Sequence, residues 1–194
     1  MVSLVALLGL VLLPSSHSRH CPRASTTRKA ELTRLKELLA TNITGNSPLP
    51  APPEIVRALQ KYIPYAGLSY CPDDSVRHMS CNHCKHITSR FTPKFHAFVT
   101  HQKTYTHSVI LVDTRQKEII VSFRGSEDLW KVISLAFITT VPYKIDAIEG
   151  AIVDEEVLEY FESIIGNITT ELTLLTQQHP DFVIVLVGHS LGEA

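Results

Sequence analysis

Residues 182–192 read Phe182-Val183-Ile184-Val185-Leu186-Val187-Gly188-His189-Ser190-Leu191-Gly192. The first six are apolar, and such an unbroken run is typical of a strand buried on both faces of a sheet. The Gly-x-Ser-x-Gly pattern that follows is that of a sharp turn between a strand and a helix, which lifts the serine hydroxyl above the sheet edge. Side chains at Gly188 or Gly192 would collide where the strand and the helix pack closely. The sequence therefore predicts a buried strand whose turn presents Ser190.

The segment before this strand has the spacing of a long helix. His179-Pro180 ends the helix, because a residue before proline is restricted to extended backbone. A helix that leads into a buried strand implies an α/β layered fold. The helix is expected from its apolar side chains, which recur at steps of three or four at Val153, Val157, Phe161, Ile164, Ile168, Leu172 and Leu175.

Short runs rich in β-branched and aromatic residues predict more strands upstream. They cover Phe95 to Thr100, Ser108 to Val112 and Glu118 to Phe123, with a turn at 113–117 between the last two. Before them, a helix is expected from Pro53 to about Tyr62, ended by Pro64 and followed by a loop that carries cysteines.

Composition excludes some classes of function. The chain has 18 basic and 19 acidic side chains in 194 residues, a net charge of -1. It therefore lacks the excess of basic residues that is typical of a nucleic-acid-binding protein. With 44% apolar and 19% charged residues, it is typical of a globular protein.

The N-terminal region predicts secretion. The apolar run from Val2 to Leu13, with small residues after it, fits a signal peptide over 1–18 that is cut after Ser18, and it is too short to span a membrane. It lacks Lys and Arg before the run, so an uncleaved anchor or a buried helix remains an alternative. Residues 19–53 form a basic segment and a Pro-rich linker, either a removed prosegment or a solvated helix, and 54–194 form the main domain.

In an oxidising compartment, four cysteines suggest disulfides. We expect Cys81 to pair with Cys84; a zinc site with His83 and His86 is the alternative. No metal and no cofactor are expected. Two triplets fit N-glycosylation, at Asn42 and at Asn167, and the second lies in a predicted helix, where an unmodified side chain is equally expected.

A second small-residue turn follows the strand Ile119 to Phe123. In acyl transfer, negative charge develops on the former carbonyl oxygen, and an elbow of this kind stabilises it with two backbone N–H groups. One is that of the residue after the nucleophile, here Leu191, and the other comes from an earlier loop, where Ser126 is the candidate.

Taken together, these motifs resemble the fungal-type (class 3) triacylglycerol lipases from about Ile55 to Ala194. The resemblance implies an α/β-hydrolase fold truncated after the nucleophile strand, Ser190 as nucleophile, Ser126 and Leu191 as oxyanion residues, and a partner for Cys71 near the family's C-terminus. The segments that carry the resemblance are Ala66 to Cys71 with Cys81 and Cys84, Val121 to Ser126 with Trp130, His179-Pro180-Asp181, and Val187 to Gly192.

The resemblance also implies a lid after Ser126, in the apolar stretch Leu129 to Ile138 with Trp130, Ile133 and Phe137. A buried core helix fits the same residues. The chain departs from the family at Glu193, where a second glycine is usual, and at Ile148 to Ala151.

The expected function is hydrolysis of lipid esters at a lipid–water interface, by a secreted enzyme that is monomeric if full length. In this fold the acid and the histidine of the triad follow the serine, and the four residues after Ser190 contain neither Asp nor His. The chain is therefore interpreted as a fragment that is inactive alone. The alternatives are a non-catalytic secreted relative that binds lipid or a partner, and another serine esterase on the same scaffold.

Overall fold

The computed structural model of the chain describes residues 51–126, 139–143 and 150–193. The chain divides into two compact units, and residues 51–62 are the described part of the smaller one. Helix α2, Pro53–Leu68, crosses the boundary between them. All other described residues belong to the larger unit.

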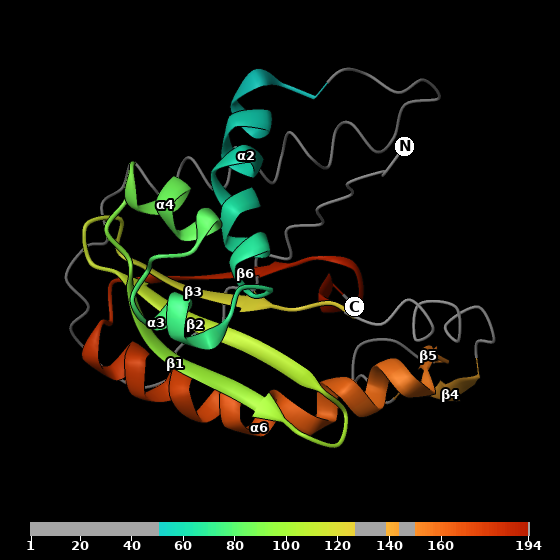
Figure 1. The fold of residues 1–194 in the computed structure, drawn as a ribbon. Coiled ribbons are helices and arrows are strands. Elements are labelled where there is room, and N and C mark those ends of the chain that lie inside the picture. The colour runs from blue at the N-terminus through green and yellow to red at the C-terminus, as the bar shows by residue number, and fades with distance from the viewer. Residues whose placement is uncertain (1–50, 127–138, 144–149, 194) are drawn as a thin grey trace, which may run out of the picture. The chain divides into compact units, whose positions relative to one another are not determined.

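The larger unit is built on a four-stranded sheet in the order β1-β2-β3-β6 (Figure 1). Strands β1 Lys94–His101, β2 Thr106–Asp113 and β3 Glu118–Phe123 are antiparallel neighbours, and β6 Val183–Gly188 runs parallel to β3. All four predicted strands are present, with their ends within two residues of the prediction. The register pairs Phe123 with Gly188, so β3 and β6 end at the same edge of the sheet.

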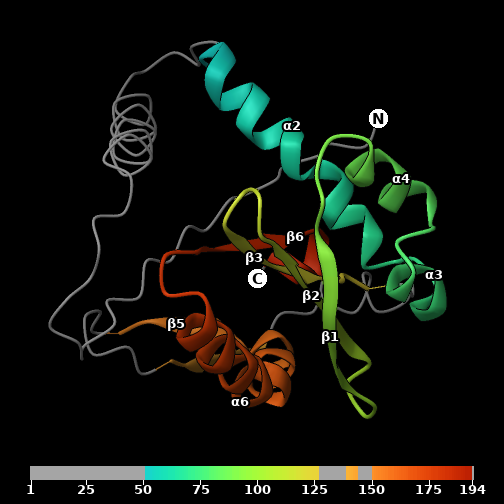
Figure 2. The same cartoon turned by 90° about the vertical axis from the view of Figure 1, so that its left-hand side faces the viewer.

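Helix α6, Glu155–Gln178, covers one face of this sheet (Figure 2). Its N-cap is Asp154, whose carboxylate accepts from the Val157 N–H at 3.0 Å, and its C-cap is His179, as the His-Pro pair predicts. The core between helix and sheet consists of Val99, Ile110, Ile119, Val121, Ile164, Ile168 and Leu175.

The predicted apolar stripe is wrong at its N-terminal end. Val153 lies in strand β5, Ile152–Asp154, which pairs with β4, Thr140–Pro142. Phe161 is 42% exposed, whereas Tyr160 is buried. The spacing does not distinguish these two, because Tyr160 and Phe161 lie four and three residues before Ile164, and both distances bring a side chain near the same helix face.

The other face of the sheet carries the last turns of α2 with two short helices, α3 Asp73–Arg77 and α4 Asn82–Thr88. The hydroxyl of Ser122 on β3 donates to the Tyr65 carbonyl at 2.6 Å, and Tyr65 is fully buried. The prediction that α2 ends before Pro64 is therefore wrong. A proline inside a helix loses one backbone hydrogen bond, and here the turn after it buries Tyr65 and Leu68.

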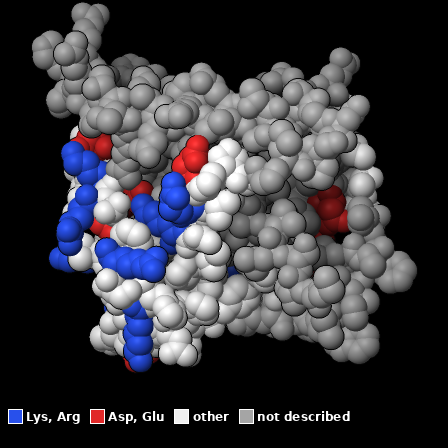
Figure 3. Space-filling model, turned by 90° about the horizontal axis from the view of Figure 1, so that it is seen from above, with Lys and Arg blue, Asp and Glu red and all other residues white. Residues whose placement is uncertain are grey.

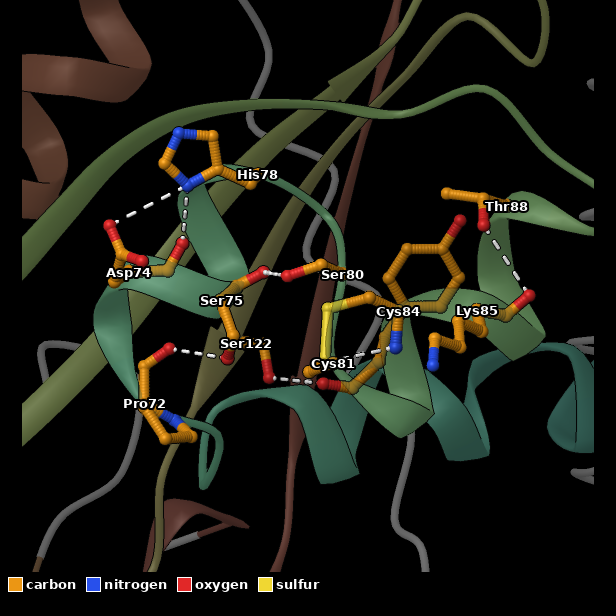
Figure 4. The surroundings of a disulfide bond; sticks show 11 residues. Pro72, Asp74, Ser75, His78, Ser80, Cys81, Cys84, Lys85, Thr88 and Ser122 are labelled. Carbon is orange, nitrogen blue, oxygen red and sulfur yellow. Dashed lines mark hydrogen bonds and ion pairs between the residues drawn. A yellow bond between two sulfur atoms is a disulfide. The ribbon is translucent and has the colours of Figure 1, made fainter.

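The predicted disulfide between Cys81 and Cys84 is confirmed, with the two Cα atoms 4.9 Å apart (Figure 4). Cys81 is also the N-cap of α4, since its sulfur accepts from the Cys84 N–H at 3.0 Å. Because both sulfur atoms are joined in the disulfide, neither cysteine can supply a thiolate to the alternative zinc site.

Strand β6 is less buried than its apolar sequence predicts. Val185 and Val187 are buried, while Ile184 and Leu186 are only half-buried. The sheet of the described residues ends at β6, so one edge of this strand has no neighbour within that sheet.

Figure 3 shows lysine and arginine side chains, with some acidic side chains among them, on the described part of the face that it draws. None of the helices in the described ranges is long and apolar enough to cross a membrane.

Candidate active site

Ser190 follows strand β6 after one intervening residue, His189, and begins a short 3-10 helix, Ser190–Glu193. Ser190 is exposed to solvent, and its backbone φ is +55°. This left-handed conformation costs a residue other than glycine roughly 1–2 kcal/mol. The backbone thus makes the sharp, strained turn that the Gly-x-Ser-x-Gly pattern predicts, with Ser190 at the carboxyl end of β6.

Gly192 allows the turn to pack against the end of β3. A Cβ at this position would lie 2.5 Å from the Phe123 carbonyl oxygen, closer than side-chain carbons approach backbone oxygen. The other glycine of the pattern, Gly188, is the last residue of β6 and pairs with Phe123. Both glycines therefore lie where the elbow meets the neighbouring strand.

Gly125 brings the loop after β3 against the elbow. A Cβ there would lie 2.4 Å from the His189 carbonyl oxygen, 2.6 Å from the Tyr70 hydroxyl and 3.1 Å from the Ser190 Cβ. Any larger residue at position 125 would push the loop away from Ser190. The sequence contains the signal for this contact, a glycine between Arg124 and Ser126, but sequence reasoning gave Gly125 no role.

Tyr70 connects these two segments from the other side. Its hydroxyl accepts the Gly125 N–H at 2.9 Å and lies 2.8 Å from Nδ1 of His189. The two rings meet edge to face, with centroids 5.7 Å apart. Tyr70 is part of the Ala66 to Cys71 motif, yet its role depends on residues 55 and 119 positions away, so periodicity and spacing do not reveal it.

The candidate oxyanion residues lie in the two segments that Gly125 brings together. Ser126 directly follows Gly125, and Leu191 directly follows Ser190; both are half-buried. The loop is further fixed at Arg124, whose N–H donates to the His107 carbonyl at 2.9 Å. The exposed serine thus lies beside two backbone turns. Acyl transfer requires such an arrangement, because backbone N–H groups near the serine can stabilise the negative charge that develops on the substrate oxygen.

Several other predicted residues lie apart from this site or outside the described residues. Asn42 and the lid residues Trp130, Ile133 and Phe137 fall in the ranges that are not described. Asn167 is exposed on α6, as glycosylation requires. Cys71 is a free, half-buried thiol. Burial raises the pKa of the Cys71 thiol, and a hydrogen bond with the backbone of His83 opposes this rise.

Comparison with known proteins identifies relatives of this arrangement. Residues 120–194 match the family model of the class 3 lipases. The secreted mono- and diacylglycerol lipases A of Penicillium cyclopium and Penicillium camembertii are each 27% identical over 141 residues, which cover 69% of this chain and 45% of theirs. The chain thus spans about half the length of these relatives.

Solved structures share the fold. The lipase of Rhizopus microsporus var. chinensis superposes with a TM-score of 0.65 at 25% identity, over 78% of this chain and 52% of that one. Lipase II of Rhizopus niveus superposes with a TM-score of 0.64 at 23% identity, over 73% of this chain and 52% of that one. These structures have the α/β-hydrolase fold, of which this chain contains the part up to strand β6 and the turn that follows it. The elbow at Ser190, the shared fold and the family match over residues 120–194 make this chain similar to the class 3 lipases.

Proposed function

We propose that the protein containing this chain is a serine hydrolase of lipid esters and that Ser190 is its nucleophile. The observation that carries the proposal is the elbow: Ser190 has a φ of +55° in the turn after β6, and the loop of Gly125 packs against it. Strained backbone held in place by its surroundings is characteristic of active sites.

The reaction proceeds by acyl transfer. The Ser190 oxygen forms a bond to the ester carbonyl carbon, and its proton goes to a general base. The tetrahedral intermediate then expels the alcohol, which takes up a proton, and water hydrolyses the acyl-enzyme to release the acid. The N–H groups of Ser126 and Leu191 donate to the oxyanion in both steps. None of the ten histidines of the chain is assigned as the general base.

Acylglycerols at a lipid–water interface are the proposed substrates. The two Penicillium relatives, which are named mono- and diacylglycerol lipases, support this class. The apolar stretch with Trp130, Ile133 and Phe137 is proposed as the lid that covers the acyl site.

Secretion is part of the same proposal. The apolar segment within residues 1–18, the Cys81–Cys84 disulfide and the word "secreted" in the relatives' names support it. Asn42 and Asn167 are then acceptors for glycans.

The test is hydrolysis of emulsified tributyrin by the full-length gene product and two variants. Ser190→Ala is expected to lower the rate by at least about 1,000-fold, because the nucleophile is lost while the fold is kept. Ser89→Ala, a change of an exposed serine after α4, is the matched control and should retain full activity. A protein that binds the emulsion without hydrolysing it would contradict the proposal and favour a non-catalytic lipid-binding protein.

A further inference from the structure

The hydroxyl of Tyr70 lies between the loop after β3 and the Ser190 turn. Its oxygen accepts the Gly125 N–H at 2.9 Å, and it lies 2.8 Å from Nδ1 of His189, close enough for a second hydrogen bond. Gly125 precedes Ser126, the first candidate oxyanion donor, and His189 precedes Ser190. One side-chain atom therefore contacts both backbone segments of the candidate site.

The Gly125 N–H has its hydrogen bond with this hydroxyl, and Gly125 is buried. A buried N–H without a partner is strongly unfavourable. Without the hydroxyl, the loop would have to turn this N–H toward water or toward another acceptor. Because peptide groups are planar and linked through single residues, such a turn also changes the direction of the next peptide group, which carries the Ser126 N–H.

Steric contact alone does not hold the loop beside the turn. A Cβ on Gly125 would lie 2.4 Å from the His189 carbonyl oxygen, so the loop cannot come much closer. Such a contact opposes closer approach only. The Arg124 N–H donates to the His107 carbonyl at 2.9 Å, which fixes the loop to β2 rather than to the turn. The hydrogen bonds of Tyr70 supply an attraction that keeps the loop and the turn from moving apart.

Tyr70 is itself held in place at its backbone and along its ring. Its N–H donates to the Gly67 carbonyl at 3.2 Å, at the end of α2, and the two residues before it, Leu68 and Ser69, are buried. The ring meets the imidazole of His189 edge to face, with centroids 5.7 Å apart. A side chain that is fixed in this way can impose a position on the groups that it binds.

We propose that Tyr70 is a positioning residue for ester hydrolysis. Its hydroxyl sets the separation between the Gly125 loop and the Ser190 turn, and thereby the separation between the N–H groups of Ser126 and Leu191. Both N–H groups must reach the oxyanion, so a small change in separation weakens the tetrahedral intermediate more than the binding of the ester. This role rests on the proposed function, in which Ser190 is the nucleophile. Tyr70 acts through the loop and takes no part in making or breaking bonds.

The test compares Tyr70→Phe with the parent in the full-length protein. The substrate is dissolved p-nitrophenyl butyrate, so that adsorption to an emulsion plays no part, and kcat is referred to active sites titrated with a p-nitrophenyl phosphonate, so that unfolded protein is not counted. The variant keeps the ring and loses the hydroxyl. We expect kcat to fall about 10- to 100-fold while KM changes less than twofold, because the lost stabilisation belongs to the transition state.

Tyr160→Phe is the matched control. It also removes a phenol hydroxyl that donates to a side chain, here the Glu156 carboxylate, but on helix α6. Its kcat should stay within twofold of the parent. A general effect of losing a hydrogen-bonded tyrosine hydroxyl would lower kcat in both variants alike and would overturn the positioning role.

Amide hydrogen exchange provides a second measurement that does not depend on hydrolysis. The Gly125 N–H should exchange at least about tenfold faster in Tyr70→Phe and at the parental rate in Tyr160→Phe. Unchanged exchange at Gly125, or a parental kcat in Tyr70→Phe while Ser190→Ala is inactive, would overturn the positioning role and leave Ser190 as the nucleophile. A fully active Ser190→Ala would instead overturn the proposed function, and the positioning role in hydrolysis with it.

Discussion

At Ser190 the conformation that presents the hydroxyl is also a source of strain. A φ of +55° is unfavourable for serine and favourable for glycine. Ser190→Gly is therefore expected to increase the free energy of unfolding by about 1 kcal/mol while abolishing hydrolysis. Urea unfolding of the purified protein measures the change. Ser89→Gly serves as control, because Ser89 has a φ of −65° and glycine there should lower stability; a gain of equal size in both variants would rule out strain relief.

Gly125 is the residue on which the contact between the loop after β3 and the Ser190 turn depends. Gly125→Ala would place a carbon 2.4 Å from the His189 carbonyl oxygen, so the loop or the elbow must move. We expect a loss of about 1–3 kcal/mol in unfolding free energy and a fall in hydrolysis. Gly166→Ala is the control: it lies within α6, where an added Cβ meets nothing within 4 Å, and it should stabilise the helix by about 1 kcal/mol. Thermal unfolding of both variants distinguishes steric conflict from a general effect of alanine.

Cys71 gives a prediction about pH. Burial raises the pKa of its thiol, and the neutral form is therefore favoured over the thiolate. Since the thiolate is the nucleophile, alkylation by iodoacetamide at pH 8 should be slower than for a cysteine in a short peptide, and the rate should reach its plateau at a higher pH. A pH–rate profile followed by mass spectrometry measures this. A profile identical to that of the peptide would show that Cys71 is not shielded.

At the scale of elements, α6 and its cap hold the sheet from one side. The Asp154 carboxylate accepts the Val157 N–H, which would otherwise lack a partner in the first turn of the helix. Asp154→Ala is expected to lower the unfolding free energy by about 1 kcal/mol, whereas Asp154→Asn should retain most of it because asparagine is also a good N-cap. Chemical denaturation of the two variants measures the difference. Equal losses would indicate that the charge of Asp154, rather than its capping bond, is what stabilises the helix.

At the scale of the whole molecule, the sequence makes a prediction about where the mature chain begins. We expect the secreted protein to lack the apolar run before Ser18, because small residues at Ser16 and Ser18 suit signal-peptide cleavage. N-terminal sequencing of the secreted protein measures the start. A first residue at Arg19 excludes a removed prosegment, whereas a first residue between positions 47 and 53 supports one. A chain that still begins at Met1 or Val2 contradicts signal-peptide cleavage.

The strands, the long helix and the Ser190 turn could be predicted from the sequence because each is encoded locally. A six-residue apolar run and a Gly-x-Ser-x-Gly pattern restrict the backbone through neighbours in the chain. The same holds for the Cys81–Cys84 disulfide, which joins residues three positions apart. Such features need no knowledge of distant segments.

What only the tertiary structure decided depends on distant segments meeting. The hydroxyl of Tyr70 connects Gly125 to His189 across 55 and 119 residues of sequence, and no periodicity encodes that contact. The continuation of α2 past Pro64 was decided in the same way, because Tyr65 is buried and its carbonyl accepts from Ser122 of β3. The sequence by itself thus determined the four strands of the main sheet, most of the long helix and the turn that presents Ser190, because these follow from short-range backbone restriction. Packing decided which side chains surround Ser190, because burial and close contact are properties of the whole fold.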